Sequence, residues 1–102
     1  MYYTYMIRCE DNSIYTGIAK DLEKRLNEHF TQNDKCAKYT KSKKALKFEI
    51  AWQTEDRTHA SKLEYRIKRL NKKSKEEIIK NPDNLNKFFE KDLECFKYKV
   101  KI

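Results

Sequence analysis

The chain contains a single glycine, Gly17, and the position of this residue constrains the fold more than any other feature. Gly17 lies near the end of a predicted strand and shortly before a predicted helix. It ends the tripeptide Tyr15-Thr16-Gly17, which follows a similar tripeptide, Tyr3-Thr4-Tyr5. Glycine is favoured where the backbone adopts a special conformation or approaches another group too closely for a Cβ. We therefore expect the two tripeptides to lie where strands, a turn and polar side chains meet.

A β-hairpin is predicted at the start of the chain. Residues 2–9 are rich in aromatic and β-favouring side chains, the turn residues Asp11-Asn12-Ser13 follow, and residues 14–18 form the returning strand. A third strand is predicted over residues 48–52, where apolar and polar side chains alternate. The same alternation over residues 96–102 predicts a short strand on a sheet edge that lysines protect.

Helices are predicted between and after these strands. Asp21 is the N-cap of a helix that extends to about residue 33. A second helix is predicted over residues 59–71, and the capping box Ser74-Lys75-Glu76-Glu77 begins a short third helix. A fourth helix follows within residues 82–102.

These elements predict a single α+β domain over residues 1–102. Its small three-stranded antiparallel sheet is flanked by helices, and the core covers about residues 2–80. The C-terminal extension, about residues 82–102, adds an extra helix and the short strand.

Basic charge is concentrated in the middle of the chain. Residues 1–34 carry four basic and six acidic side chains, and residues 76–102 carry six of each. Residues 35–75 carry fourteen basic and four acidic side chains, so this segment accounts for the net charge of +8. Such a concentration is the electrostatic footprint of a polyanion site, although an exposed lysine-rich surface gives the same count.

Three cysteines, Cys9, Cys36 and Cys95, are far apart in the sequence. They form no Cys-x-x-Cys unit and have no paired histidine, so we expect reduced cysteines and no zinc site. The chain also has no apolar segment long enough to span a membrane and no start that resembles a signal peptide. We therefore expect a soluble cytoplasmic protein.

The order and spacing of the polar residues resemble the GIY-YIG nuclease family. The residues that carry the resemblance are Tyr5, Tyr15-Thr16-Gly17, Arg25, His29 and Glu64. The similarity covers about residues 2–80 and is to small stand-alone bacterial members, which are similar to the nuclease domain of the excision-repair endonuclease. In the first motif Tyr3 and Thr4 replace a glycine and an isoleucine. Ile18 stands where several relatives have a lysine, for which Lys20 is a candidate substitute.

The resemblance implies a DNA endonuclease that hydrolyses phosphodiester bonds with one divalent metal ion, Mg²⁺ or Mn²⁺. It assigns Tyr5 as the general base, Arg25 as the phosphate clamp and Glu64 as the metal ligand. Tyr15 and His29 complete the catalytic set. At pH 7, ionising an unperturbed tyrosine costs roughly 4 kcal/mol, which its neighbours must offset.

Each of these residues also has a structural interpretation. Tyr5 and Tyr15 can pack against each other across two strands. Arg25 can pair with Asp21 four residues earlier. Glu64 can form an ordinary helix ion pair with Lys68, four residues later.

A second set of residues is predicted to bind nucleic acid through positive charge and aromatic stacking. It comprises Gly17, Lys20, Lys38, Tyr39, Lys41, Lys43, Lys44, Arg66 and Lys68. The aromatic residues available for stacking are Tyr39, Tyr65 and Trp52. We expect single-stranded or branched DNA as the partner, with RNA left open, no membrane partner, and either a monomer or a homodimer.

Two other functions stay open at this point. One is a catalytically weak or inactive nucleic-acid-binding domain on the same fold, in keeping with the altered first motif and with Ile18. The other is a protein-interaction module that uses residues 96–102 as an exposed edge strand.

Overall fold

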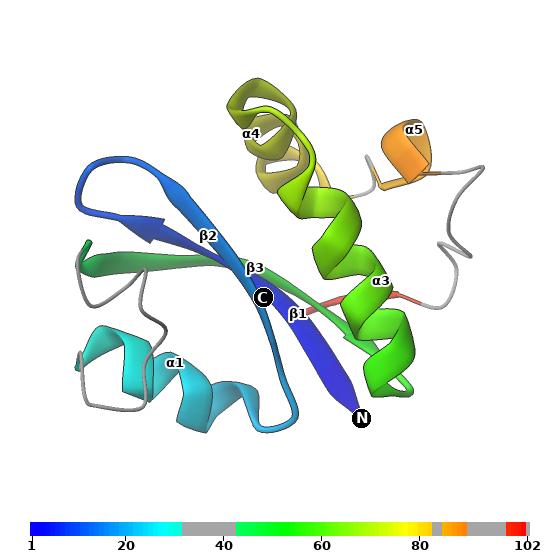
Figure 1. The fold of residues 1–102 in the computed structure, drawn as a ribbon, viewed down its shortest axis with the longest axis horizontal. Helices are drawn as coiled ribbons and strands as arrows, with labels where there is room; N and C mark the ends of the chain where they lie inside the picture. Colours follow the sequence, from blue (N-terminus) through cyan, green and yellow to red (C-terminus); the bar gives the residue numbers. More distant parts are fainter. Residues whose placement is uncertain (32–42, 83–84, 90–97, 102) are drawn as a thin grey trace.

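Four strands form one antiparallel sheet in the computed structural model of the protein, which describes residues 1–31, 43–82, 85–89 and 98–101 (Figure 1). The strands are β1 (Tyr2–Cys9), β2 (Ile14–Ala19), β3 (Ala45–Thr54) and β4 (Lys99–Lys101), in the order β2-β1-β3-β4. The three predicted strands are confirmed, and β3 is longer than predicted. The short C-terminal strand pairs with β3 at one edge of the sheet.

Helices cover both faces of this sheet. They are α1 (Leu22–Phe30), α3 (Arg57–Lys68), α4 (Lys72–Lys80) and α5 (Leu85–Phe89). Figure 1 shows α1 on one face and α3, α4 and α5 on the other, which confirms the predicted α+β class. None of the helices in the described part of the chain has the length and apolar character that crossing a membrane requires.

The alternation of side chains along β1 divides the core into two clusters. Tyr5 and Ile7 point toward α1, Met6 points toward α3, and all three are fully buried. Thr4 is also buried, and its hydroxyl donates a hydrogen bond of 2.8 Å to the Ala60 carbonyl of α3. Because β2 and β3 pair with its two edges, β1 is enclosed on every side.

Helix starts are set by local capping, and two of them differ from their predictions. α3 begins at Arg57, before the predicted start at residue 59, because Asp56 caps it by accepting a hydrogen bond of 2.9 Å from the His59 N–H. α1 begins after Asp21 as predicted, and the Asp21 carboxylate accepts a hydrogen bond of 3.1 Å from a backbone N–H of the first turn. α4 begins before the predicted capping box, because Asn71 caps it by accepting a hydrogen bond of 2.8 Å from the Ser74 N–H. Glu77, which would reach back to Ser74 in a capping box, lies inside the helix and pairs with Lys87 at 3.4 Å.

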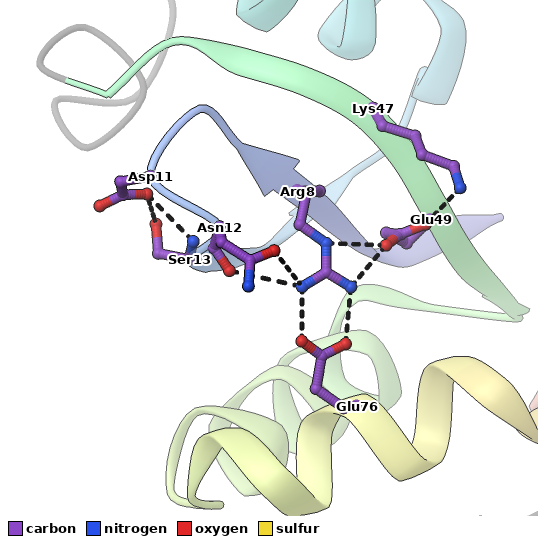
Figure 2. A network of polar contacts seen from close by, with 7 residues as sticks. All are labelled: Arg8, Asp11, Asn12, Ser13, Lys47, Glu49 and Glu76. Atoms are coloured by element: carbon purple, nitrogen blue, oxygen red, sulfur yellow. Dashed lines mark hydrogen bonds and ion pairs between the residues drawn. The ribbon is translucent and has the colours of Figure 1, made fainter.

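Arg8 joins the sheet to α4 through two carboxylates (Figure 2). Its guanidinium donates hydrogen bonds to Glu49 on β3 at 2.7 and 2.9 Å, and to Glu76 on α4 at 2.6 Å. It also donates to the Asn12 carbonyl in the hairpin turn at 3.3 Å. The side chains of Arg8 and Glu49 are 17% and 8% exposed, so this ion pair lies largely out of water. The hydrogen bond from Arg8 lowers the pKa of Glu76.

Candidate active site

Tyr5 lies in a central strand, opposite two small residues. The strand register pairs it with Gly17 on β2 and with Ala51 on β3. A Cβ at position 17 would lie 2.6 Å from the Tyr5 hydroxyl oxygen and 2.8 Å from Cζ of its ring, closer than carbon atoms approach in real structures. The φ angle of Gly17 is not positive. The close approach of Tyr5, and not a special backbone conformation, therefore explains the glycine.

Two side chains of α1 meet at the Tyr5 hydroxyl. His29 Nε2 lies 2.7 Å from the hydroxyl oxygen, and the Arg25 guanidinium forms a hydrogen bond to the same group. The spacing of four residues places Arg25 and His29 on one face of the helix. Arg25 also donates to Glu28 at 2.9 Å, so its acidic partner is Glu28 and not Asp21. Tyr5 and His29 are both fully buried.

Burial keeps Tyr5 and His29 neutral at pH 7. Burial raises the pKa of Tyr5 above its usual value, Tyr15 and Glu64 act in the same direction, and Arg25 opposes them. Burial and the charge of Arg25 lower the pKa of His29 to about 4. A guanidinium only donates hydrogen bonds, so the Tyr5 oxygen accepts from Arg25. Toward His29 Nε2 the Tyr5 hydroxyl donates when the histidine proton is on Nδ1 and accepts when it is on Nε2.

Tyr15 extends this cluster toward α3. Its ring centroid lies 6.3 Å from that of Tyr5 and 5.3 Å from that of His29. Lys68 Nζ lies 5.8 Å from the Tyr15 ring centroid, within the range of a cation–π interaction. The same ammonium group lies 3.4 Å from the Glu64 carboxylate. The five predicted catalytic residues thus come from β1, β2, α1 and α3. They converge around β1 and β2, at one end of the strand order.

The Glu64 carboxylate has the chemistry of a ligand for a hard divalent cation. Its side chain is 24% exposed, and its charge acts on the Tyr5 hydroxyl. Within the described residues, no group of three or more His, Cys, Asp or Glu side chains is arranged to hold a metal ion. One carboxylate suits Mg²⁺, which takes most of its ligands from water and phosphate oxygens. The donor set therefore fits a metal held between Glu64 and a substrate phosphate.

The predicted nucleic-acid-binding residues lie in several places. Lys43 pairs with Asp11 at 2.9 Å beside the hairpin turn, and the Lys44 N–H donates to the Glu10 carboxylate at 3.4 Å. Lys20 is exposed and lines a hollow of about 750 Å³ at the start of α1. Gly17 and Lys68 belong to the cluster of residues around Tyr5 and Tyr15, called the tyrosine cluster below. The predicted residues outside the described part of the chain are Lys38, Tyr39 and Lys41.

The three aromatic residues that were predicted to stack on bases differ in where the structure places them. The prediction for Trp52 is wrong, because its side chain is fully buried between the sheet and α3. Tyr39 lies outside the described residues. Tyr65 is 56% exposed on α3, and Arg66 lies beside its ring.

Lys75 is a cation near the site that sequence reasoning missed. Burial lowers its pKa, and the charge of Lys68 lowers it further, so α4 brings a second ammonium group toward Lys68. The two lysines lie on different helices, so no sequence spacing signals their approach. The packing of α4 beside α3 is what brings them together.

Known proteins are similar to this chain in sequence and in fold. A family model described as the GIY-YIG catalytic domain matches residues 1–77. A UPF0213 protein of Fusobacterium nucleatum is 50% identical over 101 residues, which cover 99% of this chain and 94% of that protein. The UPF0213 protein YhbQ of Salmonella typhimurium is 42% identical over 78 residues, 76% of each chain. The solution structure of a UPF0213 protein from Bacillus halodurans is 30% identical and superposes with a TM-score of 0.51, covering 78% of this chain and 84% of its own.

The match to the family model includes the whole tyrosine cluster, from Tyr5 to Glu64. A match to a catalytic domain supports a nuclease-type function with a nucleic acid as the substrate. On the evidence of the fold, the cluster and the extent of the match, the chain belongs to the GIY-YIG family.

Proposed function

We propose that the protein is a metal-dependent endonuclease that hydrolyses phosphodiester bonds of DNA, with single-stranded or branched DNA preferred. The observation that carries this proposal is the 2.7 Å contact between the Tyr5 hydroxyl and His29 Nε2, made while Arg25 bonds to the same hydroxyl. The arrangement combines a proton acceptor with a fixed positive charge, the two needs of phosphodiester hydrolysis. Membership of a catalytic-domain family supports the same reaction class.

The geometry offers a proton path that avoids a free tyrosinate. The path uses the His29 tautomer with its proton on Nδ1, which leaves Nε2 free to accept. As water attacks the phosphorus, the water proton moves to the Tyr5 oxygen and the Tyr5 proton moves to His29 Nε2. The new P–O bond forms, the bond to the leaving oxygen breaks, and that oxygen takes a proton from solvent. Burial makes an ionised Tyr5 more costly than in water, so this exchange is favoured over prior ionisation. The negative phosphate of the substrate raises the pKa of His29 and helps it to accept the proton.

Arg25 and Glu64 supply the remaining electrostatic stabilisation. Burial lowers the pKa of Arg25, but hydrogen bonds to Glu28 and Tyr5 outweigh it, so the guanidinium stays charged. In this position it neutralises charge that develops on the phosphate. Glu64 is the residue that would hold Mg²⁺ or Mn²⁺. When bound, such an ion neutralises charge on the phosphate and leaving oxygens.

A non-catalytic nucleic-acid-binding domain is the second candidate, and one contact favours it. Lys68 Nζ lies 3.4 Å from Glu64, so an ammonium group already neutralises the carboxylate that a metal would need. A domain of this kind binds a phosphate backbone without hydrolysing it. Its binding weakens steeply with salt and yields no product.

The deciding experiment measures cleavage of 5′-labelled single-stranded, duplex and forked DNA in Mg²⁺ or Mn²⁺. Glu64→Gln is compared with wild type, and Glu77→Gln is the matched control, because Glu77 also lies 3.4 Å from a lysine but on α4. We expect wild type and the control to cut, EDTA to abolish cutting, and Glu64→Gln to lose roughly 10²-fold or more in rate.

The outcomes separate the two candidates. Cutting by Glu64→Gln at the wild-type rate contradicts the metal role, and tight binding without product by wild type supports the binding domain. Tyr5→Phe keeps the ring and removes the hydroxyl that contacts His29. This variant should bind DNA and keep its circular dichroism spectrum while it loses cleavage.

A further inference from the structure

An exposed tyrosine held by two arginines lies on α3. Tyr65 is 56% exposed, and the guanidinium carbons of Arg66 and Arg69 lie 5.9 and 5.4 Å from its ring centroid. Arg69 Nη1 also donates a hydrogen bond of 3.0 Å to the Tyr65 hydroxyl. The ring is therefore positioned by cations while more than half of the residue stays open to solvent.

Core packing does not account for this tyrosine. Leu63, two residues earlier, is fully buried in the core cluster that α3 contributes to, whereas Tyr65 belongs to neither core cluster. An aromatic ring that stays exposed contributes little to folding through burial. A positioned ring with guanidinium groups beside it matches the way proteins stack the bases of single-stranded nucleic acid.

A hollow beside the ring has the chemistry to bind a phosphate. It has a volume of about 440 Å³ and is lined by Arg57, Thr58, Ser61, Lys62 and Tyr65. Two of these residues carry positive charge, three carry a hydroxyl, and none of the five is acidic. Tyr65 forms part of the lining, so one nucleotide can place its base on the ring and its phosphate in the hollow.

The ring is also close to the site of the proposed hydrolysis. Tyr65 directly follows Glu64, and consecutive helical residues differ by about 1.5 Å in rise and about 100° in direction. A helix with its side chains is about 10–12 Å wide, which limits how far apart the Glu64 and Tyr65 side chains can lie. Along a nucleic-acid strand this separation corresponds to roughly one to three nucleotides.

We propose that Tyr65, Arg66 and Arg69, together with the hollow at Arg57 and Lys62, form a subsite for an unpaired base next to the scissile phosphate. This inference rests on the proposed function and adds the basis of its substrate preference. A base in a duplex is already stacked on both faces and is not available to the ring. A base in a single strand or at a fork is available, so the subsite selects single-stranded segments.

The test measures equilibrium DNA binding by fluorescence anisotropy in EDTA, so that cleavage does not interfere. Tyr65→Leu removes the aromatic ring, and Tyr65→Phe is the control that keeps the ring and removes the hydroxyl. We expect Tyr65→Leu to weaken binding of a short single strand about 5- to 100-fold, the range for one stacked base. Binding of the matching duplex should change less than about two-fold. Tyr65→Phe keeps the ring and loses the hydrogen bond from Arg69, so it should weaken binding of the single strand less than Tyr65→Leu does.

A second arm locates the stacked base. Single strands that carry one abasic position at a time are titrated against wild type and Tyr65→Leu. One abasic position should weaken wild-type binding as much as the leucine substitution does, and the two changes together should add little. Equal losses on single strand and duplex, no loss, or full additivity at every position would each overturn the subsite. Because no step of this test requires cleavage, an inactive wild type would contradict the proposed function and leave this result intact.

Discussion

At the scale of single residues, the space beside Tyr5 is the tightest constraint on the site. The Cβ that Gly17 lacks would lie 2.6 Å from the Tyr5 hydroxyl oxygen. Gly17→Ala should therefore displace the hydroxyl from His29, destabilise the fold by roughly 1–3 kcal/mol and abolish cleavage. Urea unfolding and the cleavage assay measure both effects.

The control for this substitution is Ala51→Gly, on the other side of Tyr5 in the strand register. It removes a methyl group from the neighbouring strand and creates no clash. We expect it to cost roughly 0.5–1 kcal/mol, the ordinary cost of a strand glycine, and to keep activity. An alanine at position 17 that unfolds and cuts like wild type would contradict the steric argument.

The buried His29 should make stability depend on pH. Its pKa is lowered to about 4 in the folded protein, whereas an unfolded histidine titrates near 6.5. Between these two values the unfolded state binds the proton and the folded state does not, so stability falls as the pH falls. The loss should reach roughly 3 kcal/mol by about pH 4.

Urea unfolding at a series of pH values measures this dependence, with His29→Gln as the comparison because glutamine does not titrate. Carboxylates such as Glu76, whose pKa is lowered by Arg8, add a loss at more acidic pH in both proteins. The difference between the two curves isolates His29. If the free energies of unfolding of wild type and His29→Gln change in parallel between about pH 6.5 and pH 4, His29 is not buried as a neutral group.

The residues of the site were predictable from sequence to different degrees. Arg25 and His29 share a helix, so their spacing alone indicates that they point the same way. The full burial of His29 depends on which strand α1 packs against, and Lys75 reaches Lys68 only through helix packing. The spacing of residues along the sequence predicts neither the burial of His29 nor the approach of Lys75 to Lys68.

At the scale of elements, Arg8 attaches α4 to the sheet. Arg8→Met leaves the Glu49 carboxylate, which is 8% exposed, without its main partner. Removing one member of a buried pair is costly, so we expect a loss of roughly 3 kcal/mol in the free energy of unfolding. Urea unfolding measures it.

Lys47→Met is the matched control, because Lys47 pairs with the same carboxylate at 3.4 Å but is 71% exposed. A surface pair of this kind contributes less than about 1 kcal/mol. Similar losses for the two variants would mean that Arg8 does not anchor α4 through its charge.

Two candidate caps close together explain why the start of α4 was wrongly predicted. The capping box at residues 74–77 is a sound local signal, as the confirmed cap at Asp21 is. Asn71, three residues before Ser74, caps the helix instead by accepting a hydrogen bond from the Ser74 N–H, and Glu77 pairs with Lys87 on α5. Both Asn71 and Ser74 are good N-cap residues, so the local pattern does not decide between them.

At the scale of the whole molecule, the basic middle segment should govern how binding responds to salt. Each lysine that neutralises a phosphate contributes about 0.7 to the slope of log affinity against log salt on single strands. Lys62→Gln, in the hollow beside Tyr65, should reduce the slope by about that amount. Lys87→Gln, on α5 and paired with Glu77, should leave it unchanged; equal slopes in all three proteins would exclude Lys62 as a phosphate contact.

The class of the fold was predictable because strands and helices leave periodic patterns in the sequence. The order β2-β1-β3-β4 and the division of the helices between two faces were not, because both depend on which surfaces meet. Trp52 illustrates the difference. Its alternation predicts a strand correctly, but its burial follows from the face that α3 covers.

The enclosure of β1 has a consequence for the motions of the molecule. Backbone amides exchange their hydrogens with solvent when their hydrogen bonds open, and a central strand opens only with the most stable unit of a protein. Tyr5 and Met6 are adjacent on this strand and anchor the two core clusters on opposite faces. The Tyr5 hydroxyl therefore loses its position only when both clusters come apart. We therefore expect the site to persist as long as the folded state, and the Tyr65 side chain, which is 56% exposed, to change its contacts faster.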